Sequence, residues 1–375
     1  GADRNPSRAR ARCPDREHGA DYPPPAGEAG RGGGDGMRRL VLVTLVVGVC
    51  LAGAGAAWIR SYLATPLAIP ESGYPLEIVS GSSWSAVVQD LAADGIVEFP
   101  AILTAYGQIT GQAGRVKAGE YRLTPGTTPP SLLQLLESGR VLLHKLTLVE
   151  GWTVLDILRT IRAEPALGKT LQASSATELA RELELSWASA EGAFLPETYL
   201  FARGESDRAI LSRAHAAFKE RLGEAWEGRQ PGLPLADPYE LLTLASIVER
   251  ETALASERPL IAGVFIRRLR SGMRLQTDPT VIYGLGSRFD GNLNRRHLET
   301  DSPWNTYTRA GLPPTPIAAP SAAAIDAAAR PADGTALFFV ATGAGDGSHR
   351  FSDTLREHEA AVRDYLAALN RRDRN

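Results

Sequence analysis

The sequence predicts an α+β protein with a single N-terminal transmembrane helix, a small βα subdomain and a larger α+β domain. Three observations predict this organisation. An uncharged apolar run stands near the N-terminus, short strand-like and helical patterns fill the region up to about residue 140, and longer capped helices follow. We place the boundaries at 1–36 for a tail, 38–62 for the membrane anchor, 65–143 for the small subdomain and 144–370 for the larger domain.

The composition is that of an ordinary globular protein and excludes several classes of function. The 375 residues are 43% hydrophobic and 22% charged, which is enough chain for two domains. The formal net charge of -2 shows no basic excess, so we expect no nucleic-acid partner. Both cysteines, Cys13 and Cys50, precede the globular part, which excludes a disulfide framework and a thiol nucleophile there and suits an oxidising compartment.

Residues 1–36 are rich in Arg, Gly, Pro and Asp and lack hydrophobic periodicity, so we expect this tail to be disordered. Met37 is the first methionine and stands directly before Arg38-Arg39 and the apolar run. We therefore hypothesise that translation starts at Met37 and that residues 1–36 are not expressed.

The run from Leu40 to Ile59 is uncharged and about 20 residues long, which is enough for a helix to cross the hydrocarbon core of a membrane. Small residues just before Trp58 leave a cleaved signal peptide as the alternative. Arg38-Arg39 on the amino side predicts a cytoplasmic N-terminus, because basic residues tend to be retained on that side. We therefore expect everything after Tyr62 to face outward.

Local patterns predict the elements of the globular part. In the small subdomain, Ser83 to Gly95 and Ser131 to Glu137 have the periodicity of helices, and Gly119 to Gly126 has the pattern of a strand running into a turn. The larger domain opens with a predicted strand from Leu142 to Val149. Near its end, a strand from Ala336 to Thr342 precedes a glycine-rich turn.

The most strongly supported helix begins at Asp237, where Asp as N-cap, Pro at the first helical position and Glu240 form a capping-box-like pattern. Its periodicity directs Glu249 toward the interior and leaves Ser246 and Arg250 on the polar side. Glu251 falls on the other flank of the apolar arc, so we expect the two carboxylates to point apart and not to form a catalytic pair. Periodicity alone fits two roles for Glu249, a flank residue paired with an arginine and a desolvated general acid.

Two further segments carry polar groups that suit a binding cleft. Gln276, Thr277, Asp278 and Tyr283 stand close together, and Asp278 precedes a proline, which predicts a loop or strand end; an Asp cap and a core Tyr are the alternatives. From Pro303 to Pro314, aromatic, amide and hydroxyl side chains crowd a predicted loop, a mixture that suits a sugar but also occurs in ordinary loops.

Other chemistries lack their motifs. The six histidines include no His-Glu-x-x-His pair, and no Cys/His cluster has zinc-ligand spacing, so we expect no metal site. The glycine-rich stretch 343–348 lacks the lysine and the helix of a nucleotide loop, and no serine nucleophile motif is evident. We expect no cofactor.

The sequence resembles a known family in four blocks, taken in order along residues 65–370. The blocks are Leu244-Ala-Ser-Ile-Val-Glu-Arg-Glu-Thr252, Leu275-Gln-Thr-Asp-Pro-Thr-Val-Ile-Tyr-Gly284, Asn305-Thr-Tyr307 and Gly311-Leu-Pro-Pro314. They resemble the MltG/YceG-like endolytic murein transglycosylases. The resemblance implies a bacterial inner-membrane protein with a periplasmic catalytic domain, and a LysM-like fold for about residues 72–140.

The resemblance also implies roles for particular residues. It assigns Glu249 as the catalytic residue and suggests that Glu197, where relatives often carry Asp, lines the cleft. The other substrate-binding residues that it implies are Gln276, Asp278, Tyr283 and Asn305. His349-Arg-Phe351 matches a family motif, and we assign it no chemistry.

For the reaction, the resemblance implies cleavage within peptidoglycan glycan strands by one carboxyl that acts first as acid and then as base, giving 1,6-anhydro ends. The resemblance also implies that peptidoglycan synthases are partners of the protein. Cleavage is then expected to terminate the growth of nascent strands. Two other hypotheses stay open. One is a non-catalytic wall-binding protein, and the other is a hydrolase in which Glu249 and Glu197 form a carboxylate pair.

Overall fold

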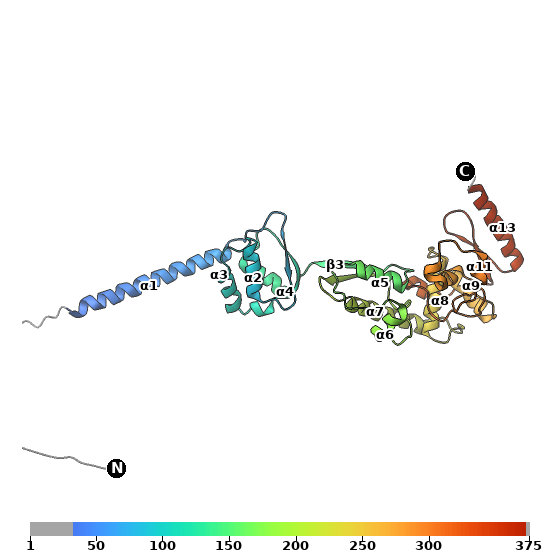
Figure 1. The fold of residues 1–375 in the computed structure, drawn as a ribbon, viewed down its shortest axis with the longest axis horizontal. Coiled ribbons are helices and arrows are strands. Elements are labelled where there is room, and N and C mark those ends of the chain that lie inside the picture. Colours follow the sequence, from blue (N-terminus) through green and yellow to red (C-terminus); the bar gives the residue numbers. More distant parts are fainter. Residues whose placement is uncertain (1–32, 373–375) are drawn as a thin grey trace, which may run out of the picture. The chain divides into compact units, whose positions relative to one another are not determined.

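The computed structural model describes residues 33–372 of the chain (Figure 1), which contain helices and short two-stranded sheets. The chain divides into two compact units, residues 1–65 and 66–375, and each is described by itself. The predictions for residues 1–32, Cys13 among them, lie outside the described residues. Residues 33–36 were predicted to be disordered, but they form the first turn of helix α1 (Gly33–Ala64), because a helix once nucleated extends at little cost.

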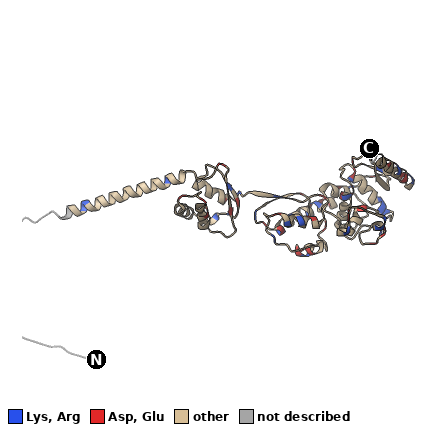
Figure 2. Cartoon of the chain, turned by 45° about the horizontal axis from the view of Figure 1, so that its top comes forward, with Lys and Arg blue, Asp and Glu red and all other residues tan. Residues whose placement is uncertain are grey.

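Helix α1 is the predicted apolar helix. From Gly36 to Ala64 it is long and apolar enough to cross a membrane, and its large apolar side chains are exposed. Figure 2 shows it without charge over most of its length, with basic residues toward its two ends. Both a membrane anchor and a signal sequence have this form.

The small subdomain is built on an antiparallel pair of strands. Strands β1 (Tyr74–Ile78) and β2 (Gly119–Leu123) pair from Tyr74 with Leu123 to Ile78 with Gly119. Between them in the chain come α2 (Trp84–Ala93), α3 (Pro100–Ile109) and η1 (Ala113–Arg115), and α4 (Pro129–Ser138) follows β2. The predicted strand and helices of this region are confirmed.

The larger domain opens with a second antiparallel pair. Strand β3 (Leu143–Thr147) pairs with β4 (Thr198–Ala202), with Thr147 opposite Thr198. The chain between them carries α5 (Val154–Ala163) and α6 (Ala176–Glu182), and α7 (Asp207–Glu227) follows β4. Apolar side chains from these elements form one core, with Ile157, Phe194, Phe201 and Leu211 among its buried members.

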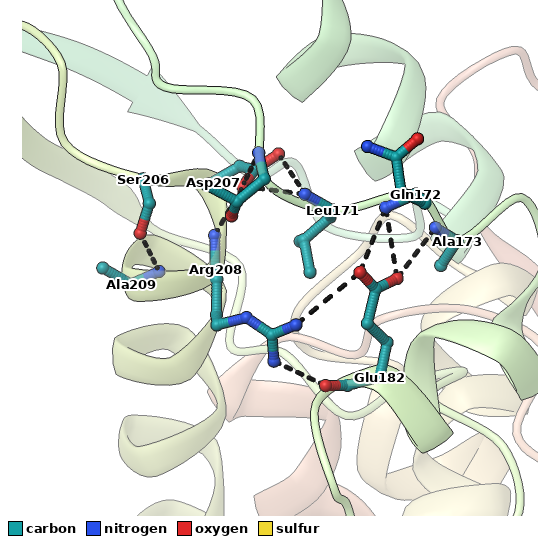
Figure 3. Close-up of polar contacts among 9 residues, drawn as sticks. Leu171, Gln172, Ala173, Glu182, Ser206, Asp207, Arg208 and Ala209 are labelled. Carbon is teal, nitrogen blue, oxygen red and sulfur yellow. Dashed lines mark hydrogen bonds and ion pairs between the residues drawn. The ribbon is translucent and has the colours of Figure 1, made fainter.

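Polar contacts hold the loop between α5 and α6 against α7, as Figure 3 shows. Asp207, only 2% exposed, accepts hydrogen bonds from the backbone N–H groups of Thr170 and Leu171. Glu182 accepts from the N–H groups of Gln172 and Ala173 and forms an ion pair with Arg208. The carboxylates thus replace the backbone partners that an irregular segment lacks.

Helix α8 (Pro238–Glu251) is the centre of the second core. Asp237 caps it, with its carboxylate accepting from the Glu240 N–H at 2.9 Å, which confirms the predicted start. Residues 241–248 are all buried, because α7, α9 (Arg258–Arg270) and α12 (Ala322–Ala329) pack around the helix. The prediction that Ser246 faces a polar side is therefore wrong: its hydroxyl is buried and accepts from the Ile317 N–H.

The remaining elements complete the domain. After α9 come α10 (Asp278–Leu285), η2 (Gly286–Arg288) and α11 (Arg295–Glu299), and residues 300–320 are irregular, as predicted for 303–314. Strands β5 (Phe338–Ala341) and β6 (His349–Ser352) pair across the predicted glycine-rich turn, and α13 (Leu355–Arg372) ends the described chain. In that turn Gly343, Gly345 and Gly347 adopt positive φ angles that favour glycine.

Candidate active site

Three hydrogen-bond donors converge on the carboxylate of Glu249 in the last turn of α8. Its side chain is only 6% exposed. One oxygen, Oε2, accepts from the backbone N–H of Ser321 at 2.9 Å and from the Ser321 hydroxyl, and Oε1 accepts from Nη2 of Arg258 at 3.2 Å. The predicted inward direction of this side chain is confirmed. The contacts fix the carboxylate in one orientation.

Local sequence places both partners. Ser321 precedes a run of alanines and is the N-cap of α12, so its N–H and hydroxyl lie at the positive end of that helix. Arg258 is the first residue of α9, just after Glu257. Glu257 in turn accepts from the backbone N–H of His349 at 2.8 Å and contacts its Nδ1 at 2.7 Å. This pairing joins β6 to the start of the helix that carries Arg258.

Glu249 lines an open cavity of about 660 Å³. The end of α8 forms one side, and the segments that follow β3 and precede β4 form another. Glu197, the predicted cleft residue, lines the same cavity with an exposed side chain, and its carbonyl accepts from the Leu148 N–H at 2.9 Å. Glu249 and Glu197 are therefore brought together in one cavity. Other charged residues that line it are Glu150, Arg250, Glu251 and Arg258.

Glu251 was predicted to point away from Glu249, and the two carboxylates do have different partners: the Thr277 hydroxyl donates to Oε1 of Glu251, while Ser321 and Arg258 donate to Glu249. Glu251 nevertheless lines the same cavity as Glu249. Burial raises the pKa of the Glu251 carboxyl to about 7, and the nearby charge of Asp278 acts in the same direction. Periodicity placed Glu251 on a flank, but it could not show that the helix ends at the cavity wall.

Asp278 and Gln276 lie outside the lining of this cavity. The prediction of a loop or strand end for Asp278 is wrong, because it is the first residue of α10; proline is favoured in the first turn of a helix, and here Pro279 marks a helix start. The Asp278 carboxylate accepts from the Tyr307 hydroxyl at 2.6 Å. Gln276 is exposed and has a positive φ of 50°, and its N–H donates to the Thr306 carbonyl at 3.2 Å.

Tyr283 lines a second cavity, of about 740 Å³. Its hydroxyl donates to Oε2 of Glu191 at 3.0 Å, and burial raises the pKa of the Tyr283 hydroxyl. Asn305 is 1% exposed and orders the loop that follows α11. Its Nδ2 donates to the carbonyls of Leu298 at 2.9 Å and Thr300 at 2.7 Å.

Glu191, Ser321 and Arg258 were not predicted as site residues from the sequence. Glu191 stands between Ala190 and Gly192, and a carboxyl among small and apolar residues is a signal of burial that could have been followed. It is 2% exposed, and burial raises its pKa to about 7. Ser321 gave only a helix-cap signal, because its nearness to Glu249 arises from the packing of α12 on α8. Within residues 33–372, no group of three or more His, Cys, Asp or Glu side chains is placed to hold a metal ion.

Comparison with known proteins identifies the chain. The family model described as the YceG-like family matches residues 76–364, which is well over half of the sequence. The chain belongs to the YceG-like family. The matched residues of this YceG-like chain begin in β1 and include both cavities, while α1 lies before them.

Curated relatives of this YceG-like chain include an endolytic murein transglycosylase of Bacillus subtilis. It is 30% identical over 312 residues, which cover 79% of this chain and 85% of the relative. A Streptococcus pneumoniae protein of the same name is 27% identical over 323 residues, 77% of this chain and 58% of that protein. Among solved structures, a putative YceG-like protein of Listeria monocytogenes is 28% identical with a TM-score of 0.48, covering 78% of this chain and 99% of the other.

Proposed function

We propose that this chain is an endolytic peptidoglycan lytic transglycosylase that cuts the bond between N-acetylmuramic acid and N-acetylglucosamine within glycan strands and leaves 1,6-anhydro ends. The observation that carries the proposal is the buried carboxyl of Glu249, held by Ser321 and Arg258 at the wall of an open cavity. The relatives named endolytic murein transglycosylase support it.

In the first step, the Glu249 carboxyl donates its proton to the glycosidic oxygen while the bond from that oxygen to C1 of the muramyl sugar breaks. In the second step, the Glu249 carboxylate takes the proton of the C6 hydroxyl as that oxygen attacks C1. The 1,6-anhydro ring closes, no water is consumed, and the carboxyl regains its proton. One carboxyl thus serves as acid and base.

The contact with Ser321 suits a group that changes its protonation state. A hydroxyl donates to a carboxylate, and after rotation it accepts from a protonated carboxyl. The Ser321 hydroxyl therefore remains a partner of Glu249 in both steps. The Ser321 N–H and Arg258 donate only, and they stabilise the carboxylate that forms between the steps.

The other predicted site residues take supporting roles in the proposal. Glu197 contacts the sugar in the cavity of Glu249, and Tyr283 orients the strand in the second cavity. Gln276 and Asp278 line neither cavity and bind or orient the strand from exposed positions. Asn305 acts by shaping the loop that carries Tyr307, the partner of Asp278.

We extend the proposal to the rest of the chain. The order β1, α2, α3, β2 supports a LysM-like, glycan-binding role for about residues 72–140. Helix α1 serves as an inner-membrane anchor with Arg38-Arg39 in the cytoplasm, so that the catalytic domain lies in the periplasm, where it terminates nascent strands beside peptidoglycan synthases.

A hydrolase is the second candidate, because Glu197 and Glu251 line the same cavity as Glu249 and could serve as a base for water. Mass spectrometry of products from peptide-free glycan strands separates the candidates. Anhydro ends support the lyase, reducing ends support the hydrolase, and binding without products supports a wall-binding protein. The Glu249→Gln variant is the control for contaminating activities.

A further inference from the structure

The second cavity combines aromatic faces with buried polar groups. Its volume is about 740 Å³, and it is bounded by the start of α5, by α10 and by the loops around Trp304 and Phe289. The rings of Tyr283 and Trp304 meet at 65° with centroids 5.6 Å apart. The Trp304 Nε1 donates to the Thr315 hydroxyl at 2.9 Å, which fixes the ring. Leu155, 53% exposed, adds an aliphatic surface at the wall.

A carboxyl stands in the wall between these rings and α5. Glu191 accepts from the backbone N–H of Val154 and from the Tyr283 hydroxyl, both at 3.0 Å. Because a carboxyl oxygen has more than one acceptor site, this group still offers acceptor capacity to a ligand. Hydroxyls of Thr153, Ser175 and Ser189 also belong to residues that line the cavity.

Arg250 connects the two cavities. It lines both, and its Nη1 donates to the Gly151 carbonyl at 3.2 Å, while Gly151 lines the cavity of Glu249. The two cavities therefore adjoin at Arg250. An endolytic enzyme binds its polymer on both sides of the bond that it cuts, so a long strand requires sites beyond the reacting sugars.

We propose that the cavity formed by Leu155, Glu191, Tyr283, Phe289 and Trp304 is a saccharide subsite, which binds N-acetylated sugars of the same strand that is cut at Glu249. The inference rests on the proposed function. Aromatic faces stack on the apolar faces of sugar rings, and Glu191 accepts from sugar hydroxyl or acetamide N–H groups.

The lining favours the sugar over the stem peptide of peptidoglycan. A stem peptide brings carboxylates, which need cations. Both arginines of the lining already have partners, since Arg159 pairs with Asp156 at 3.0 Å and Arg250 donates to Gly151.

The test measures binding by calorimetry to the full-length chain in detergent, in a Glu249→Gln background that prevents cleavage. The probes are a disaccharide and a long oligosaccharide of alternating N-acetylglucosamine and N-acetylmuramic acid, both without peptide. The variants are Leu155→Ala and Leu155→Ala with Phe289→Ala, since neither side chain is part of a buried core cluster. Leu355→Ala is the matched control, because Leu355 is 57% exposed and lines neither cavity.

We expect the double variant to bind the long oligosaccharide about tenfold more weakly, from lost apolar contact, with disaccharide binding unchanged. Leu155→Ala alone should weaken binding of the long oligosaccharide in the same direction. Because Leu155 is half exposed and alanine is well tolerated in a helix, this single variant keeps the test valid if the double variant folds poorly. Unchanged affinity of the double variant for the long probe overturns the inference, as does an equal loss of affinity in the Leu355→Ala control. Cleavage of polymeric glycan by the wild-type chain is scored separately, and its absence overturns the proposed function instead.

Discussion

Ser321 donates both its backbone N–H and its hydroxyl to a single carboxylate oxygen of Glu249. The same hydroxyl accepts from the Ala324 N–H at 3.1 Å and so caps α12. One serine therefore joins the start of one helix to the end of another at the cavity wall. This relationship places Glu249 at the positive end of a helix, in contact with a group that can follow its protonation.

The lone-carboxyl mechanism predicts different outcomes for the two glutamates of α8. Glu249→Gln should lower the rate of anhydro-product release by at least about 10²-fold, because a general acid and base is lost. Glu251→Gln should retain most of that rate, since the amide oxygen still accepts from Thr277. Liquid chromatography with mass spectrometry of the released ends measures both. Equal losses would contradict the single-carboxyl mechanism.

Ser321→Ala should affect both stability and catalysis. Loss of the cap should lower the free energy of unfolding by about 1 kcal/mol, and loss of the hydrogen bond to Glu249 should slow cleavage about tenfold. Ser206→Ala is the matched control, because Ser206 caps α7 through the Ala209 N–H at 3.1 Å and lines neither cavity. Similar losses of stability with similar losses of activity would show that Ser321 acts only as a cap.

The ion pair between Arg258 and Glu249 should show strong coupling, since the two side chains are only 10% and 6% exposed. Arg258→Met leaves a buried carboxylate without its cation and should destabilise the chain by about 3 kcal/mol. Adding Glu249→Gln should recover part of this loss. Denaturant unfolding of the four proteins of this cycle gives the coupling energy, and strictly additive losses would argue against the pair.

The raised pKa of Glu251 predicts how stability changes with pH. A carboxyl whose folded pKa is about 7 holds its proton more tightly in the folded than in the unfolded state, so stability falls as pH rises from about 4.5 to 7. Glu251→Gln removes this dependence and should stabilise the chain relative to wild type above pH 7, by up to roughly 3 kcal/mol. Unfolding curves across this pH range measure it. Parallel curves for the two proteins would refute the prediction.

Membrane anchoring by α1 predicts a position-dependent effect of charge. Val46→Arg places a charge in the apolar run at a cost of about 3 kcal/mol and should reduce the protein found in the membrane fraction. Ile109→Arg is the control, since Ile109 is 86% exposed on α3, outside α1. Peptide mapping of the membrane-bound protein should recover residues 40–59. A mature chain that begins after this run would instead identify a cleaved signal peptide.

Much of the local structure followed from the sequence, because its causes are local. Asp237 with Pro238 fixed the start of α8, the pattern from Ala336 to Thr342 predicted β5 and the turn after it, and the uncharged run predicted α1. The prediction of a loop or strand end at Asp278 was wrong because a proline fits two situations, an extended residue before it and the start of a helix. The local sequence pattern does not distinguish between these two situations.

The sequence by itself determined α1, the start of α8, the family resemblance and Glu249 as the candidate catalytic residue. Tertiary structure alone decided which groups surround that residue. Ser321 lies 72 positions from Glu249 and Glu191 lies 92 positions from Tyr283, so their contacts depend on how α12 packs on α8 and how the loop that carries Glu191 meets α10. Helix periodicity assigns a side chain to a face, but burial on that face depends on the neighbours, and so Ser246 is buried and Glu251 reaches the cavity.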